Sequence, residues 1–327
     1  MRRPIICTAI APAVATVLAL AAFGCGEKDE APTAAPAPEA AAFPDPGDGT
    51  LEDLVTQSAS GDGLVVSPAG QVFTEGRNRF GLGVFTVERE QVTDADVAIY
   101  AAQGADGRVQ GPFPARVESL ETEPAFTAEN TAGDPDAAKT VYATELVLDE
   151  PGEWRLVALV READEFAAVI MPSVVVRAND SVPAPGDPAP SVHTPTSDQV
   201  SNIQEIDTRV PPSSMHEDDL ADVLGKKPAV LLFATPALCQ SRVCGPVVDI
   251  AEQVKRDYED DAAFIHMEIY NENLPNKGLR PQVEAYNLPT EPWLFVIDCE
   301  GNVDSRIEGA FSVGELTDSV ERVKNTC

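Results

Sequence analysis

Two cysteines in the C-terminal half of the chain are close enough to carry redox chemistry. They are Cys239 and Cys244, in a run that begins at Thr235 and reads Thr-Pro-Ala-Leu-Cys-Gln-Ser-Arg-Val-Cys-Gly-Pro. A thiolate is the attacking group in thiol–disulfide exchange, and the unpaired N–H groups at a helix start stabilise it. The sequence predicts Cys239 at such a start, with Arg242 adding positive charge. Cys239 is therefore the expected nucleophile and Cys244 the resolving cysteine.

The spacing of this pair restricts the local backbone. In an unbroken helix, residues five apart have Cα atoms roughly 8–9 Å apart. This separation exceeds the limit of about 7 Å for a disulfide. We therefore expect the 239–244 segment to be partly non-helical, or to unwind on oxidation. Three roles stay open for the pair, namely a redox-active dithiol, a structural disulfide of an exported protein, and a metal site.

Cys299 and Cys327 are expected to have a structural role. Cys299 ends a predicted strand over 293–298, after which the chain returns along 303–307 and a final helix runs to Cys327. A strand of about seven residues and a helix of about fifteen both span roughly 23 Å. The two cysteines therefore return to the same end, and we predict a disulfide worth roughly 3–4 kcal/mol.

The elements that must position the cysteine pair alternate between strands and helices. The apolar run 228–234 predicts a strand buried on both faces, and apolar residues at helical spacing follow the cysteines. Capping-box patterns at Ser214–Glu217 and Ser312–Glu315 predict the starts of two further helices. Together with the strand 263–270 and the hairpin strands 293–298 and 303–307, the order is β-α-β-α-β-β-α.

This arrangement resembles the thioredoxin fold. Pro292, in Glu-Pro-Trp before the hairpin, stands where that family has its cis-proline, which implies a cis Glu291–Pro292 bond and a role in shaping the substrate groove. The Thr-Pro and Cys-x4-Cys-Gly pattern is similar to Q-type (bacterioferritin-comigratory) peroxiredoxins, which implies roles for Thr235 and for a cysteine that attacks peroxide. Thr235 lies four residues before the first Cys, whereas that family has three. The resemblance therefore supports the fold and the redox pair more than the peroxidase reaction.

Copper handling is a third possible function for a thioredoxin-like chain. Copper-delivery proteins of this fold pair two nearby cysteines with a distant histidine, and the chain has three histidines. His193 lies in a linker, His216 in the first turn of a predicted helix, and His266 on an inner strand, where a packed side chain is expected. None stands at the expected hairpin position, so we predict no metal ligands and no cofactor.

Residues 49–178 predict an antiparallel β-sandwich. Short runs rich in β-forming residues alternate with turn residues across this region. The turn Asp149–Trp154 resembles the entry to a strand in bacterial immunoglobulin-like domains. Because the region contains no His and no Cys, we expect a spacer or docking module without catalytic residues.

The first 48 residues predict export and attachment to a membrane. Two arginines precede an apolar run that ends at Gly24, and Ala-Phe-Gly-Cys follows, similar to the lipobox of bacterial lipoproteins. This resemblance implies a signal peptide over 1–24, lipidation at Cys25 and a membrane-anchored protein on the extracytoplasmic face. Residues 25–48, rich in Ala, Pro and acid, are expected to form a disordered tether.

Composition excludes some partners. With 23 Lys and Arg against 54 Asp and Glu, the net charge is −31, which disfavours nucleic acid and electrostatic docking to anionic lipid. We expect an α/β thioredoxin-like domain over 200–327, joined by a Pro-rich linker over 179–199 to the immunoglobulin-like sandwich. The leading function is a tethered thiol–disulfide oxidoreductase acting on protein thiols and disulfides, or on a peroxide. A non-catalytic binding or scaffold lipoprotein is the alternative.

Overall fold

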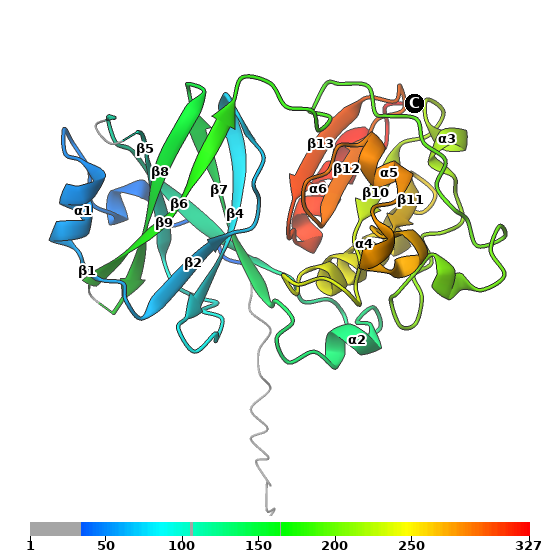
Figure 1. The fold of residues 1–327 in the computed structure, drawn as a ribbon, viewed down its shortest axis with the longest axis horizontal. Coiled ribbons are helices and arrows are strands. Elements are labelled where there is room, and N and C mark those ends of the chain that lie inside the picture. The colour runs from blue at the N-terminus through cyan, green and yellow to red at the C-terminus, as the bar shows by residue number, and fades with distance from the viewer. Residues whose placement is uncertain (1–33, 105–106, 164) are drawn as a thin grey trace, which may run out of the picture. The chain divides into compact units, whose positions relative to one another are not determined.

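The computed structural model describes residues 34–104, 107–163 and 165–327 (Figure 1). The predicted signal peptide, the lipidation site Cys25 and the first part of the predicted tether lie outside this range. Among the described residues, none of the helices has the length and apolar character needed to cross a bilayer. The described residues belong to one compact unit, in which a β-rich module precedes an α/β module.

The N-terminal module is built on a nine-stranded sheet. The strands follow the order β1-β9-β8-β5-β6-β7-β4-β2, with β3 also pairing with β9. All pairs are antiparallel except those that β1 and β3 make with β9. The strand bounds are β1 (Ala59–Ser60), β2 (Leu64–Pro68), β3 (Phe73–Thr74), β4 (Gly76–Thr86), β5 (Val97–Gln103), β6 (Gln110–Ser119), β7 (Thr140–Leu148), β8 (Gly152–Glu162) and β9 (Glu165–Arg177).

Strand β6 joins the two halves of this sheet. Its first part pairs with β5, where Val97 faces Ala115, and its second part pairs with β7, where Arg116 faces Ala143. Apolar side chains from both halves, Leu82 and Trp154 among them, share one buried core. The sequence predicts neither β6 nor its bridging role, because two prolines, at positions 112 and 114, interrupt the β-forming run.

Two parts of residues 34–48, a segment predicted as a disordered tether, contact the N-terminal module. Ala35 exchanges two backbone hydrogen bonds with Val117 of β6. Phe43 is buried beside helix α1 (Leu51–Gln57), and the Tyr100 hydroxyl donates to the Pro44 carbonyl. The composition of this segment favours disorder, but its one large apolar side chain, Phe43, has a place in the core of the module.

The C-terminal module has a four-stranded sheet in the order β11-β10-β12-β13. Strands β10 and β11 are parallel, whereas β12 is antiparallel to both β10 and β13. Its elements are α3 (Leu220–Val223), β10 (Ala229–Phe233), α4 (Cys244–Tyr258), β11 (Ala263–Met267), α5 (Pro281–Ala285), β12 (Trp293–Ile297), β13 (Val303–Glu308) and α6 (Val313–Val323). From β10 onward this is the predicted order, and the topology is that of a thioredoxin-like fold.

Both faces of this sheet are covered, as a continuous apolar strand such as β10 requires. Leu232 and Leu294 point into a core shared with α4 and α6. Ile265 and Met267, on the opposite face, pack in a second core with α5.

The described residues also contain short 3-10 helices in both modules, at Ala40–Ala42, Ile203–Glu205, Asn271–Asn273 and Pro275–Lys277.

The two predicted capping boxes have different outcomes. The Ser312 box is present, because Ser312 and Glu315 cap each other's backbone at the start of α6. The box at Ser214 is wrong, because α3 begins at Leu220 with Asp219 as its N-cap. The Ser214 side chain instead binds Glu252 of α4, so His216 lies in extended chain rather than in a first helical turn.

Residues 179–199, predicted as a linker, also pack on the C-terminal module. Gly186 and Ala189 donate backbone hydrogen bonds to Val303 and Gly301 at the β12–β13 turn. Val182 and Ala189 are buried in the second core. These contacts add an extended segment to the edge of the hairpin.

The connection between β6 and β7, residues 120–139, joins the two modules and contains the short helix α2 (Glu129–Ala132). Leu120 and Val141, at its two ends, belong to the same buried core as α4 and α6. Beside them, Arg79 and Arg116 of the N-terminal module form ion pairs with Glu315. The same module therefore supplies both apolar and charged contacts to α6.

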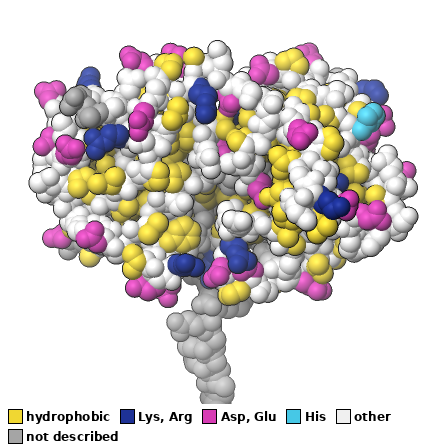
Figure 2. All heavy atoms as spheres, viewed as in Figure 1, with side chains coloured by type: hydrophobic (Ala, Val, Ile, Leu, Met, Phe, Trp, Pro, Cys, Tyr) yellow, Lys and Arg dark blue, Asp and Glu magenta, His cyan; other side chains and the backbone are white. Residues whose placement is uncertain are grey.

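The surface is consistent with the acidic composition. On the face drawn in Figure 2, acidic side chains are spread over both modules and interspersed with fewer basic ones. A dispersed negative charge of this kind favours solubility and disfavours the phosphate backbone of nucleic acids.

A disulfide joins Cys299, just after β12, to Cys327, with the two Cα atoms 5.3 Å apart. The bond fixes the end of α6 to the sheet and closes a loop with a sequence separation of 28. We expect the Cys299→Ser/Cys327→Ser double variant to lose roughly 3 kcal/mol of unfolding free energy, because its unfolded chain is less constrained. Guanidinium denaturation will measure the loss. Each single variant should lose as much as the double, and clearly smaller single losses would contradict this explanation.

Candidate functional site

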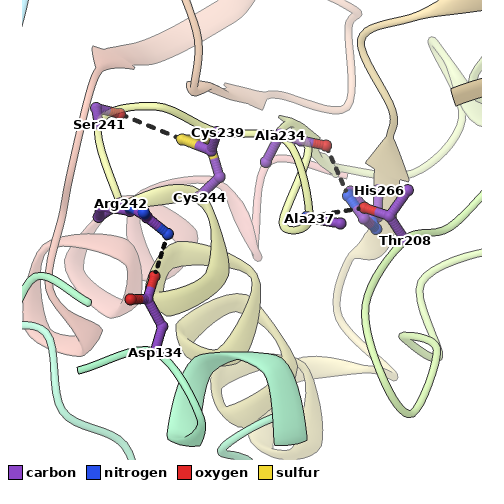
Figure 3. Close-up of a disulfide and its surroundings, with 9 residues drawn as sticks. All are labelled: Asp134, Thr208, Ala234, Ala237, Cys239, Ser241, Arg242, Cys244 and His266. Carbon is purple, nitrogen blue, oxygen red and sulfur yellow. Dashed lines mark hydrogen bonds and ion pairs between the residues drawn. A yellow bond between two sulfur atoms is a disulfide. The ribbon is translucent and has the colours of Figure 1, made fainter. Parts of the chain in front are cut away.

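The cysteine pair forms a disulfide at the start of α4 (Figure 3). Cys244 is the first residue of α4, and Cys239 lies in the turn before it, with the two Cα atoms 5.9 Å apart. The 239–244 segment is therefore non-helical up to Cys244, which was one of the two expected outcomes. The placement of Cys239 at the helix start is wrong, because Cys244 occupies that position. Cys239 is 8% exposed and Cys244 is fully buried, so Cys239 is the more accessible of the two.

Thr235 begins the turn that carries Cys239. Its carbonyl accepts backbone hydrogen bonds from Leu238 at 3.2 Å and from Cys239 at 3.1 Å. Its hydroxyl is buried and makes no hydrogen bond to any described residue. The Ser241 hydroxyl lies 3.2 Å from the Cys239 sulfur, where it could donate to a thiolate. Ser241 was not predicted as a site residue.

The Arg242 side chain, whose charge was predicted to act on Cys239, is paired with an acidic residue. Its guanidinium donates to Asp134 of the β6–β7 connection at 2.9 Å, as Figure 3 shows. Its backbone has a positive φ of 60°, and its carbonyl accepts from the Ala138 amide. The β6–β7 connection thus contacts the cysteine turn directly through Asp134 and Ala138. Neither residue belongs to a sequence motif.

Pro292 lies at the edge of the sheet from which the cysteine turn leaves. The Glu291–Pro292 bond is cis, as the thioredoxin resemblance implies. Trp293 pairs with Phe233, the last residue of β10, so Pro292 lies near the point where β10 leads into Thr235. The Trp293 side chain is buried in the second core and stacks on Phe295. Trp293 is therefore a core residue on the sheet face opposite that of Cys239.

Polar side chains that the sequence analysis did not identify hold the cysteine turn. The His266 ring, on β11, donates through Nε2 to the Ala234 carbonyl at 3.0 Å. The Thr208 hydroxyl accepts from the Ala237 amide at 3.1 Å, and the Thr208 amide donates to the Glu268 carboxylate at 2.7 Å. Figure 3 shows the His266–Ala234 and Thr208–Ala237 contacts on one side of the turn and the Arg242–Asp134 pair on the other.

Two acidic side chains near Pro292, those of Glu268 and Glu291, have raised pKa values. Burial raises the pKa of Glu268, and burial together with the nearby Glu268 charge raises the pKa of Glu291 to about 7. Each carboxyl has one buried oxygen without a hydrogen-bond partner among the described residues. A carboxyl whose pKa is near 7 exchanges protons at neutral pH, as a group beside a redox pair would need to do.

The raised pKa of Glu291 predicts a pH-dependent stability. A carboxyl that titrates at about 7 when folded and about 4.5 when unfolded binds more protons in the native state, so stability falls as pH rises through this interval. As the pH rises from 4.5 to 8, the free energy of unfolding of Glu291→Gln should increase relative to that of the wild type. The total increase should be roughly 2 kcal/mol, after allowance for partial solvent exposure. Urea denaturation across this range will measure it. The matched control is Glu145→Gln at an exposed carboxylate, and equal slopes for Glu291→Gln and wild type would contradict the prediction.

Comparisons with known proteins give similarity at the level of structure. No protein-family model matches the chain, and no curated protein sequence matches it. One similar structure, from Chlorobium tepidum, is described as a thiol:disulfide interchange protein DsbE, with 16% identity over 44% of this chain and 99% of that one and a TM-score of 0.32. Another, from Chlorobium tepidum TLS, is described as a thiol:disulfide interchange protein of the thioredoxin family, with 20% identity over 45% and 100% of the two chains and a TM-score of 0.29.

The C-terminal module is a thioredoxin-like domain with a disulfide at the start of its first long helix. This description follows from the β11-β10-β12-β13 order and the Cys239–Cys244 bond. Both cysteines are buried, with 8% exposure left at Cys239 and none at Cys244, and the carboxyl of Glu268 is buried as well. Chemically, such a pair can store two electrons as a dithiol and release them on forming the disulfide.

Proposed function

We propose that the chain is a thiol–disulfide oxidoreductase that acts through Cys239 and Cys244. The observation that carries the proposal is a disulfide between cysteines of unequal exposure, formed where a strand of a thioredoxin-like sheet leads into a helix. The two structures from Chlorobium tepidum are described as thiol:disulfide interchange proteins, and protein thiols and disulfides are accordingly the proposed substrates.

The reaction proceeds through a mixed disulfide. In the reducing direction, the Cys239 thiolate attacks one sulfur of a substrate disulfide, forms the mixed disulfide and releases the first substrate thiolate. The Cys244 thiolate then attacks the Cys239 sulfur, which restores the 239–244 bond and releases the second substrate thiolate. The protein dithiol loses two electrons and the substrate disulfide gains them. With a peroxide as substrate, Cys239 would become a sulfenic acid, and Cys244 would displace water from it.

The proposal also covers the location of the protein, the role of its N-terminal module and its partners. We propose that Cys25 is lipidated and holds the protein at the extracytoplasmic face of the cell membrane, where disulfides persist. The N-terminal module, for which we propose an immunoglobulin-like relationship, would act as a docking module. The dispersed acidic surface disfavours nucleic acid as a partner.

The test is disulfide reduction by the full chain. We expect the dithiol form to reduce insulin disulfides and the Cys239→Ser/Cys244→Ser double variant to be inactive. The reduction potential of the 239–244 pair, measured against glutathione, should lie above about −300 mV, the range in which a disulfide cycles. A lower potential together with inactivity would favour a structural disulfide in a scaffold protein. Peroxide consumption would identify the second substrate class, and stoichiometric Cu(I) binding by the dithiol would instead favour copper handling.

A further inference from the structure

Three side chains from separate parts of the sequence meet in the interior of the C-terminal module. Asp207 and His216 come from the extended chain before α3, and His266 comes from β11. All three are at most 2% exposed. One ligand atom of each, a carboxylate oxygen or a ring nitrogen, lies within 4.8 Å of the other two. The proposed oxidoreductase reaction gives these ligand atoms no role.

The hydrogen bonds of His266 determine which of its nitrogens holds a hydrogen. The Ala234 carbonyl can only accept, so Nε2 of His266 is the donor. In a neutral ring, Nδ1 then carries a lone pair, and this lone pair faces the Asp207 carboxylate oxygen at 3.6 Å. A positive charge between these two electron-rich atoms or on the ring, from either a metal ion or a proton, would stabilise this arrangement.

His216 approaches the same Asp207 oxygen as His266 does. Its Nε2 lies 3.0 Å from the same Asp207 oxygen, and its buried Nδ1 has no hydrogen-bond partner among the described residues. The Asp207 carboxylate also accepts from the Arg209 and Ser213 amides at 2.7 and 2.6 Å. The Arg209 amide donates to the carboxylate oxygen that faces away from the histidines, and His266 donates its Nε2–H to a backbone carbonyl. Metal-binding carboxylates and imidazoles commonly have outer contacts of these two kinds.

Two of the three ligand separations lie within about 0.3 Å of those of a tetrahedral site, and the third, between the two histidine nitrogens, is at most 4.8 Å. Zinc lies about 2.0–2.2 Å from nitrogen and oxygen ligands, which places neighbouring ligand atoms roughly 3.3–3.5 Å apart in a tetrahedron. The Asp207 oxygen is 3.0 Å from His216 Nε2 and 3.6 Å from His266 Nδ1. The Ser213 hydroxyl lies 3.2 Å from His266 Nδ1, in place for a fourth ligand or for a hydrogen bond to one.

We propose that Asp207, His216 and His266 bind a divalent first-row transition metal ion, with zinc as the ion that best fits two imidazoles and one carboxylate. This donor set suits such metals, and it is separate from the cysteine pair. Because His266 also holds the Ala234 carbonyl, the bound ion would fix the strand end from which the Cys239 turn begins.

The test uses the full chain with both disulfides formed and with Cys7→Ser and Cys25→Ser in every protein compared, so that no free thiol competes for metal. Because the site is buried, the protein is refolded from guanidinium with zinc chloride, dialysed, and analysed for zinc per chain by mass spectrometry. We expect one zinc per chain in the wild type and at least a tenfold lower occupancy in His216→Gln and Asp207→Asn. His193→Gln is the matched control, because this exposed histidine pairs with a different carboxylate, that of Asp219, and should keep the zinc.

A second measurement uses the wild type alone, in case the variants do not fold. Refolding with cobalt chloride should give the visible absorption of tetrahedral Co²⁺ without thiolate charge-transfer bands. Wild-type protein with less than a tenth of the expected zinc and no cobalt spectrum would overturn the proposal. Equal zinc in His216→Gln and wild type would overturn it as well. The cluster would then be a hydrogen-bonded ion group in which His266 keeps two ring protons.

Discussion

Cys244→Ser accumulates a covalent adduct through Cys239, whereas Cys239→Ser forms none. The reason is that Cys239 keeps 8% exposure whereas Cys244 has none, so we expect a substrate disulfide to react with Cys239. Without Cys244 the mixed disulfide has no internal thiolate to resolve it. Both variants should lose insulin reduction by a factor on the order of 10³, and the double variant should be no worse, because the two sulfurs act as a unit. Mass spectrometry of the protein after incubation with a peptide disulfide will detect the adduct.

A matched control for this prediction is Ser241→Ala. It removes the hydroxyl beside the Cys239 sulfur but keeps both cysteines. We expect this variant to retain turnover at a reduced rate and to form no lasting adduct. An adduct on Cys244 in the Cys239→Ser protein would contradict the assigned order of attack.

Asp249→Ala should destabilise the protein by about 3–5 kcal/mol, the range measured when one partner of a buried ion pair is removed. Asp249 of α4 accepts from the Arg209 guanidinium at 2.8 Å and from the Ala128 amide at 3.1 Å. The side chains of Arg209 and Asp249 are only 7% and 1% exposed, so the substitution leaves a guanidinium in the interior without its counter-ion. Thermal and urea unfolding of the full chain will measure the loss.

Two further variants separate charge from packing in this prediction. Asp249→Asn keeps an acceptor oxygen of similar size and should lose less than Asp249→Ala. Glu145→Ala breaks the exposed Arg77–Glu145 pair and should change stability by less than about 1 kcal/mol. A loss at Asp249 no larger than that at Glu145 would show that the Arg209 charge finds another partner or reaches solvent.

Local pattern was sufficient to predict much of the C-terminal module. The run 228–234 is apolar at every position, and only a strand covered on both faces accommodates this, as β10 shows. Ser312 and Glu315 carry a complete capping box, whose contacts involve only neighbouring residues. The disulfide between Cys299 and Cys327 was predicted from the lengths of one strand and one helix. In each case the deciding interactions lie within one element or between adjacent ones.

The parts that were missed depend on contacts between distant positions. Arg242 was expected to act on Cys239, but Asp134, which is 108 residues earlier, binds its guanidinium. Asp207, His216 and His266 meet only after β11 has paired with β10 and the preceding chain has packed beside it. Ser214 matches a capping box in sequence, yet Glu252 from α4 binds its side chain and the helix begins later. Local sequence patterns do not reveal contacts between residues that are this far apart in the chain.

The shared core at Leu120 and Val141 has a consequence for how the protein responds to heat. Because these residues belong to the cluster that contains α4 and α6, melting either module exposes apolar surface of the other. A calorimetric scan of the full chain should therefore show a single cooperative endotherm. For the same reason, we expect neither fragment of a chain cleaved near residue 178 to unfold cooperatively by itself. Mixing the two fragments should restore the single unfolding transition.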